Sequence, residues 1–518
     1  MSPFHHHLLR ILRPKQHDYE AVATGLPTLR AQGHYLPSSR HAYRRILTCR
    51  SVLLFIPFIP ILLISIILFS GFPALYADIR GFESRFPQHN VSYSESRGVK
   101  YLAFPDHMWG HGWNNVLQEY LMYSYLAYIT NRSYVFDDYT WSHFPLPYTI
   151  YDFALRPTRV PLNAFISGPL SGGPLPPPSR SAPRAVHSKF WDKICPREKR
   201  HVISSTDVPA NVWGLRRIEW WRNEIAKFED LDCLQIDTHQ EPMFSFSFFG
   251  GYELLDVWPS LSQTPIVTSF EWSPLVSSAV DRNFVALSDS HEHLSTPQAN
   301  QEPAPLQSAS STASALTAVP THPSLVALHI RRGDYNRHCT RLAQWGLYFH
   351  GFNSFEGLPD PWIPFTGSLP SDEAEEYYRK RCLPTQDEIV ERLHSVRAEY
   401  DLFITGQSPE TNTTQPAITE KASPPPTHRL RRVFVLSNAW PAWLNGLKQK
   451  LIKDGWDDVV FGGDLILDKE QRGVDVAVDM SIAERAEVFV GNGFSSLSGN
   501  IIMLRTAKGF HSQTNRLL

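Results

Sequence analysis

Apolar residues follow two patterns that alternate along much of the chain: short unbroken runs and helical spacings. YLAFP, starting at Tyr101, and SYVF at 133–136 have the form of short buried strands. Between them, apolar and aromatic residues recur at helical spacing over 115–130, after a glycine-rich turn. A strand, a loop, a helix and another strand predict the opening of a doubly wound α/β sheet.

The C-terminal part of the chain shows the same alternation more clearly. Its predicted strands are VALHI at 326–330, RVFVLS at 432–437, residues 459–461 and EVFVG at 487–491. Its predicted helices cover 386–400 and 495–504, and a further one begins at Ser481, which forms a capping-box pattern with Glu484. This order predicts a second parallel sheet.

Three stretches interrupt the globular pattern: 167–184, 290–321 and 407–427. They are rich in Pro, Ser, Thr, Ala and Gly, and cannot bury enough apolar surface to order themselves. We therefore expect loops or linkers there. The second stretch, taken as a linker over 290–322, separates an N-terminal lobe at 100–289 from a C-terminal lobe at 323–518.

An uncharged apolar run at 51–72 is long enough for a membrane span of about 20 residues. A buried core helix is the alternative. Basic residues such as Arg50 precede the run and acidic residues such as Asp78 follow it, which predicts a cytosolic N-terminus. We expect a disordered tail over 1–50, a transmembrane anchor and a stem over 73–99.

The run begins fifty residues into the chain and lacks a small-residue cleavage site, so a cleaved signal peptide is not expected. The prediction is a single-pass type II protein of the Golgi or endoplasmic reticulum membrane, with its body in the lumen. Four of the five cysteines would then lie in an oxidising compartment. Three pairings are possible, and proximity in sequence favours Cys195–Cys233 and Cys339–Cys382. The formal net charge is −2, so no overall field favours a nucleic-acid partner.

The segment HIRRGD at 329–334 places cations at the end of a buried strand. Residues two apart on a strand share a face, so His329 and Arg331 are expected to point into one cleft. An arginine fork suits a diphosphate, and His329 could bond to ribose or base. The alternative is a surface arginine pair beside a core histidine.

The segment VFVGNGFSSLSGNI at 488–501 joins a strand to a helix through Gly-Asn-Gly. A helix N-terminus is an anion site, the glycines could let backbone approach a ligand, and Ser495 and Ser496 would add hydroxyl donors. Ordinary helix capping by serine is the alternative.

In PDHMWGHGWNNVLQ at 105–118, His111 and Asn114 lie between a strand and a helix. The asparagine could bridge a phosphate oxygen and a sugar hydroxyl, and an imidazole can serve as a general base. A glycine turn followed by an asparagine cap is the alternative.

Together these three segments resemble the GDP-fucose-dependent protein O-fucosyltransferases. HIRRGDYNRHC resembles that family's HxR-type motif, GHGWNN its first glycine–asparagine loop, and 474–505 its C-terminal segment. The convincing similarity covers about sixty residues. It implies a GT-B-like α/β fold of two Rossmann-like lobes, with the donor in the cleft between them.

The resemblance also implies residue roles. Arg331 would hold the β-phosphate and His329 would lie near the guanosine. Asp479 would accept from guanine, Ser495 and Ser496 would bind phosphate oxygens, and Asn114 would reach the donor from the first lobe. Some members carry a glutamate base where this chain has His111, so the resemblance does not identify the general base of this chain.

The resulting prediction is an inverting, metal-independent transfer of fucose from GDP-fucose to a hydroxyl of a protein or glycan. The Asp-x-Asp string at 230–232 is a weak sign of metal use, because it lies in a polar, helical-looking stretch. Alternatives are a GT-B enzyme with another donor, or an inactive membrane-anchored binding protein on the same fold.

Overall fold

A computed structural model shows the arrangement of most of the chain. The residues it describes are 58–69, 74–105, 111–143, 145–151, 154–209, 212–237, 243–244, 246–287, 322–405 and 429–518. The chain divides into two units, Met1–Ile64 and Ser65–Leu518. The predicted tail and the stretches 290–321 and 407–427 lie outside the described residues.

Helix α2 (Phe58–Phe69) lies within the predicted anchor and consists of apolar residues with one serine. The first seven and last three residues of the predicted anchor lie outside the described part of the chain. Among the helices described, none is both long and apolar enough to cross a membrane.

The second lobe is built on a five-stranded parallel sheet of order β14-β13-β12-β15-β16. Its strands are β12 (His322–Ile330), β13 (Arg432–Ser437), β14 (Asp458–Phe461), β15 (Ala486–Gly491) and β16 (Asn515–Leu517). The connecting helices are α14 (Tyr335–Trp345), α15 (Asp372–Cys382), α16 (Gln386–Thr405), α17 (Pro441–Lys453), α18 (Asp475–Arg485) and α19 (Ser496–Ala507). The order is that of a doubly wound sheet, as predicted.

Alternate residues of β12 belong to two different cores. Val326, Leu328 and Ile330 pack with residues of α16 and α17. Leu325 and Ala327 belong to the cluster that contains residues of α18 and α19. The strand is therefore covered on both faces, which explains why it is a nearly continuous apolar run. Burial of each such aliphatic side chain contributes roughly 1.5–3 kcal/mol.

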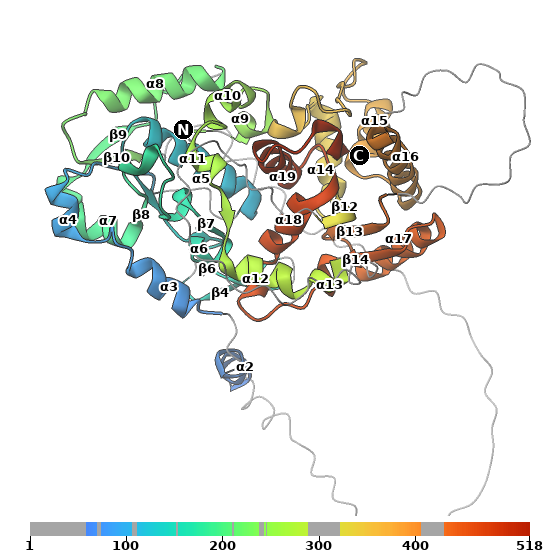
Figure 1. Cartoon of the computed structure of the whole chain (residues 1–518), viewed down its shortest axis with the longest axis horizontal. Helices are drawn as coiled ribbons and strands as arrows, with labels where there is room; N and C mark the ends of the chain where they lie inside the picture. The colour runs from blue at the N-terminus through green and yellow to red at the C-terminus, as the bar shows by residue number, and fades with distance from the viewer. Residues whose placement is uncertain are drawn as a thin grey trace, which may run out of the picture. The chain divides into compact units, whose positions relative to one another are not determined.

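The first lobe contains another five-stranded parallel sheet, of order β8-β2-β1-β10-β9. Figure 1 labels β8, β9 and β10 of this sheet. Its strands are β1 (Tyr101–Ala103), β2 (Ser133–Phe136), β8 (Val186–His187), β9 (His201–Ser204) and β10 (Cys233–Asp237). The main helices of this lobe are α5 (Trp113–Ile129), α7 (Ser188–Ile194), α8 (Gly214–Ala226) and α12 (Pro274–Arg282). Two lobes built on parallel sheets confirm the predicted α/β class.

Residues 74–99 form α3 (Ala77–Ser84) and α4 (Val91–Ser96) and pack into the folded unit, which differs from a free stem. Tyr76 is 1% exposed, and its hydroxyl donates to the Glu470 carbonyl at 2.9 Å. Phe86 and Gln88 are buried as well. Glu83, one of the acidic residues that follow the apolar run, is buried too.

The proline-rich stretch 167–184 is partly folded rather than wholly a loop. It contains β7 (Ile166–Ser167) in part and two short 3-10 helices, Pro169–Ser171 and Ser179–Ser181, and Leu170 is buried in the main core. Both favoured disulfides, Cys195–Cys233 and Cys339–Cys382, are formed.

Candidate functional site

The candidate site lies at the carboxyl ends of the strands of the second sheet. From β12 the chain passes to β13 and β14 on one side, then returns to β15 on the other. Such a reversal leaves a crevice outside the strand ends, where ligands of α/β proteins collect. Arg331 follows β12 directly, and Ser495 and Ser496 follow β15, so three predicted residues lie at this switch point.

Arg331 is held at the edge of the lobe by two neighbours in sequence. Its Nη2 donates to Asp334 Oδ2 at 2.6 Å, and its guanidinium lies 4.8 Å from the Tyr335 ring centroid. Its Nε has no hydrogen-bond partner among the described residues. The Tyr335 hydroxyl donates to the Phe494 carbonyl at 2.8 Å. Tyr335 therefore connects Arg331 with the segment that leads into α19.

His329 lies deeper than the alternation of the strand suggested. It is 2% exposed, and its Nδ1 is 2.8 Å from the Ser498 hydroxyl on the first turn of α19. Burial, and then the charge of Arg331, lowers the pKa of His329 to about 3. A neutral imidazole is therefore expected at physiological pH. Its contact with Ser498 links β12 to α19, the helix that begins at Ser495 and Ser496.

The Gly-Asn-Gly turn before α19 is shaped by internal packing. A Cβ on Gly491 would lie 2.8 Å from Ser498, and one on Gly493 would lie 2.4 Å from the Phe349 ring. Protein side chains therefore occupy the positions that side chains at 491 and 493 would need, so both glycines are required for internal packing. The turn is also tied by Asn353, whose Nδ2 donates to the carbonyls of Gly493 and Ser495.

Ser495 is the N-cap residue of α19 and Ser496 its first residue. The Ser495 side chain is buried but makes no capping hydrogen bond to the helix. Ordinary serine capping, the alternative considered above, is thus not what this residue does. Backbone N–H groups of a first helical turn have no partner within the helix, so they can receive an anion.

Asp479 lies on the second turn of α18, near the carboxyl end of β14. Its carboxylate lies against Gly462, where an added Cβ would be 2.6 Å from both oxygens. The side chain has no hydrogen bond to another described residue. Burial, and then Asp475, raises the pKa of Asp479 well above its usual range. A carboxyl group in this state is available to a ligand that offers N–H donors.

Asn114 joins the two lobes at α19. The Asn500 side-chain amide donates to the Asn114 carbonyl at 2.9 Å and to its Oδ1 at 3.0 Å. A second connection joins Trp272 Nε1 to the Glu484 carboxylate at 2.5 Å. His111 is exposed at the start of α5, and its carbonyl accepts from the Tyr139 hydroxyl. The structure thus brings Asn114 to α19 and leaves His111 on the surface.

Several residues of this site were not predicted from the sequence. Ser498 and Asn500 lie inside the quoted SSLSGN segment, two and four residues after Ser496, and Tyr335 directly follows RRGD. Asn438 is more distant: it accepts from the Arg332 N–H at 2.8 Å and donates to Asp334 at 2.9 Å. Polar residues within one helical turn of a motif were the signal that could have identified the first three.

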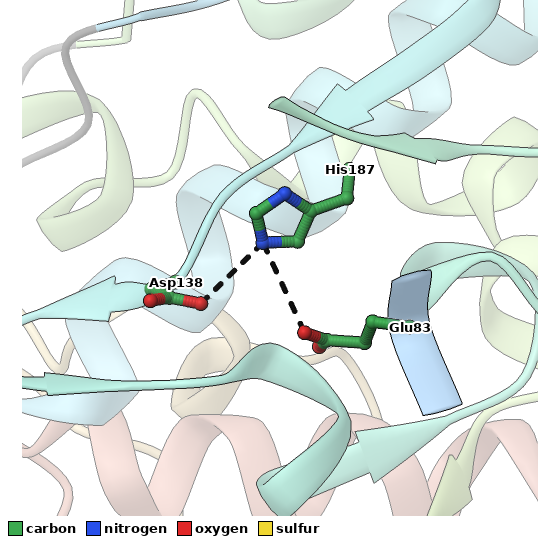
Figure 2. A group of neighbouring side chains, drawn as sticks. All are labelled: Glu83, Asp138 and His187. Atoms are coloured by element: carbon green, nitrogen blue, oxygen red, sulfur yellow. Dashed lines mark ion pairs between the residues drawn. The ribbon is translucent and has the colours of Figure 1, made fainter. Parts of the chain in front are cut away.

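A separate cluster of Glu83, Asp138 and His187 has the side chains of a metal site (Figure 2). His187 Nε2 lies 3.5 Å from Asp138 Oδ1 and 3.9 Å from Glu83 Oε2, and all three residues are buried. However, His187 Nδ1 accepts from the Lys189 N–H at 3.0 Å, so the proton belongs on Nε2. A metal on Nε2 would require a proton on Nδ1, facing that N–H.

These residues therefore do not fit a metal, and they act as an anchor for α3. Arg80 pairs with Asp138 at 2.7 Å, and Asn163 Nδ2 donates to Glu83 at 3.1 Å. The Asp-x-Asp string at 230–232 immediately precedes β10, at the amino-end edge of the first sheet. The candidate site is built at carboxyl ends, so this string is not placed to serve it.

Comparisons with known proteins gave distant structural likenesses. No family model and no curated protein sequence matches the chain. POFUT1 in complex with GDP-fucose is 14% identical with a TM-score of 0.43, covering 80% of this chain and 95% of that one.

Two further solved structures show weaker likenesses. A mutant of Arabidopsis thaliana FUT1 in complex with GDP is 10% identical with a TM-score of 0.33, covering 84% and 78% of the two chains. NodZ alpha-1,6-fucosyltransferase soaked with GDP-fucose is 10% identical with a TM-score of 0.32, covering 78% and 92%. At identities and TM-scores this low, none of these likenesses carries an argument about fold or activity.

Proposed function

We propose that this chain is an inverting fucosyltransferase that moves fucose from GDP-fucose to a hydroxyl of a protein or glycan acceptor. The proposal rests on one observation: Arg331 and the N-terminus of α19 both lie at the carboxyl ends of neighbouring strands, at the switch point of the second sheet. The same helix binds Asn114 of the first lobe. The motif resemblance supplies the identity of the donor.

In this proposal the diphosphate takes the place of Asp334 beside Arg331. The pair that it must break is exposed, with 30% and 54% of the two side chains accessible. Such a surface pair contributes about 0–1 kcal/mol, whereas a bidentate phosphate contact is substantially stronger. Asp334 therefore keeps the guanidinium in place without closing the site.

Guanine is recognised by Asp479. Its carboxyl group has no protein partner among the described residues, and guanine presents N–H groups on its Watson–Crick edge. The ionised carboxylate is restored when those N–H groups bind, because hydrogen bonds to the charged form favour it. A uracil ring lacks the paired N–H groups, so discrimination against UDP is expected.

Transfer proceeds as a single displacement. The acceptor oxygen forms a bond to the anomeric carbon while the bond to the β-phosphate oxygen breaks, and the acceptor proton passes to a general base, for which His111 is the candidate from the sequence. Negative charge grows on the leaving GDP, and Arg331 with the α19 N–H groups stabilises it. No metal ion is needed in this scheme.

Release of GDP from GDP-fucose, with water as acceptor, tests the proposal without knowledge of the natural acceptor. The full-length protein in mild detergent should release GDP slowly, and Arg331→Ala should lower the rate at least tenfold. Arg341→Ala, an exposed arginine of α14, is the matched control and should retain the rate. Absence of release with both GDP-fucose and other nucleotide sugars would argue against a transferase.

A second candidate is a donor-binding protein without turnover. It is favoured by the surface position of His111, which stands where some related enzymes carry a glutamate base. This candidate requires selective binding of GDP with no release of fucose, even in the presence of acceptors. The two measurements together separate it from the enzyme.

A further inference from the structure

A cavity of 610 Å³ lies in the first lobe, apart from the candidate site. Its walls come from α4, from Asn131 in the turn before β2 and from the segment that leads into β8. These are the amino ends of the strands, whereas α5 begins at the carboxyl end of β1. The cavity therefore opens at the edge of the sheet opposite to the proposed transfer site. Its size is within the roughly 300–1,000 Å³ of small-molecule sites.

The charges around this cavity are of one sign. Arg97, Lys100, Arg180 and Arg184 line it, and the lining contains no aspartate or glutamate. The first three form no ion pair with any residue that the structure describes. Arg184 donates through Nε and Nη2 to the Gly172 carbonyl, which fixes its guanidinium. The acids Glu95 and Asp232 lie nearby but do not line the cavity. Burial is the main cause of the raised pKa of Tyr101, and the charges of these two acids raise it further.

Neutral polar groups accompany these cations. Gln88, 9% exposed, donates through Nε2 to the Gly172 and Ala185 carbonyls at 2.9 Å. Its Oε1 is buried and accepts no hydrogen bond from the described part of the chain. Asn90 and Asn131 bring further amides to the lining.

An aromatic face completes the site. Tyr93 is 46% exposed, and the Arg97 guanidinium lies 5.1 Å from its ring centroid. A half-exposed ring offers an apolar surface on which the C–H face of a sugar can pack. Cations, amides and a ring together correspond to a hydroxyl-rich ligand that carries negative charge.

We propose that this cavity binds an anionic saccharide, with its sulfate or carboxylate between Arg97 and Arg180. The site does not overlap the donor site, so its ligand and GDP should bind independently. The inference does not depend on the proposed function, because it follows from the lining of the cavity.

The test is calorimetric titration of the full-length protein, purified in mild detergent. Asn90 and Asn131 both begin Asn-X-Ser sequences, so any N-linked sugar must first be removed enzymatically. The probes are a sulfated disaccharide, a uronic-acid disaccharide, a neutral disaccharide of equal size and inorganic sulfate. Binding of a charged disaccharide is expected, and which of the two binds identifies the charged group.

The double variant Arg97→Ala/Arg180→Ala should weaken that binding at least tenfold. Arg216→Ala/Arg222→Ala, which removes two exposed arginines of α8, is matched in charge and should leave it unchanged. Thermal unfolding and GDP titration of both variants report whether the fold and the second lobe are intact. Equal binding of the neutral sugar or of sulfate alone, equal losses in both variants, or no binding at all would overturn the proposal.

Discussion

Arg331 and Arg505, two arginines of the motif segments, have opposite environments. Arg505 is fully buried, and its guanidinium donates to the carbonyls of Glu484 and Ala486 and to Asn515 Oδ1. Arg331 is partly exposed and its only strong partner among the described residues is exposed Asp334. Of the two, Arg331 is available to a ligand, whereas Arg505 joins the ends of α18, β15 and β16.

Arg505→Lys should therefore destabilise the fold. An ammonium group cannot replace a planar fork that donates in several directions, and buried carbonyls left without donors cost about 1–3 kcal/mol each. A loss of at least about 3 kcal/mol is expected in urea unfolding, with Arg341→Lys as the exposed control. Unchanged stability combined with loss of GDP binding would instead make Arg505 a ligand residue.

Residue types at the site were easier to predict than their contacts. The two-residue period of a strand correctly separates His329 from Val326 and Leu328, which pack with α16 and α17. It could not show that Ser498 would enclose the imidazole, since that depends on how α19 packs. Arg331 lies just beyond the last strand residue, where the period no longer determines direction.

At the scale of elements, strands were predicted well because buried parallel strands are short, continuous apolar runs. The predicted strands 133–136 and 432–437 coincide with β2 and β13. The capping-box prediction at Ser481 is wrong. The helix begins at Asp475 and Ser481 lies inside it, because a strand follows directly at Ala486 and leaves no room for a later helix.

The segment before β1 is an integral part of the folded unit, and Tyr76 is its main attachment. Tyr76→Ala removes a buried ring and its hydrogen bond to Glu470, so we expect a loss of about 3–5 kcal/mol in the free energy of unfolding. Phe82→Ala, a 55% exposed position on α3, should cost less than about 1 kcal/mol. Similar effects of the two changes in urea unfolding would show that Tyr76 is not the main attachment of this segment.

For the whole molecule, the stability of the fold should decrease as the pH falls below neutrality. Burial lowers the pKa values of His322 and His350 from the ordinary 6.5 to about 4. The unfolded chain therefore binds more protons between about pH 6.5 and 4, and the stabilisation present above pH 6.5 is lost across that window. Each histidine contributes a slope of up to about 1.4 kcal/mol per pH unit. Glu83 and Asp479, whose pKa values are raised by burial, act in the opposite direction.

A comparison of variants isolates one histidine from this sum. His322→Phe should reduce the slope of unfolding free energy against pH between pH 6 and 5 by about 1 kcal/mol per unit. The control is His394→Gln, a change at a histidine whose side chain is 62% exposed. An unchanged slope in His322→Phe would mean that this imidazole is protonated in the fold.

The assembly of the two lobes is the part that local patterns could not predict. Asn114 and Asn500 are 386 residues apart, and Trp272 and Glu484 are 212 apart. No periodicity connects such pairs; they meet because two separately predictable sheets pack together. The proposed site depends on this packing, since Asn114 reaches α19 only through it.

The central claim is that the switch point of the second lobe binds guanosine diphosphate through Arg331. We would titrate the full-length protein calorimetrically with GDP and UDP in the presence of EDTA, alongside Arg331→Ala and Arg341→Ala. The account predicts that GDP binds more tightly than UDP, and that Arg331→Ala weakens GDP at least tenfold while Arg341→Ala does not. Failure of the folded wild-type protein to bind GDP, or undiminished binding by Arg331→Ala, would contradict it.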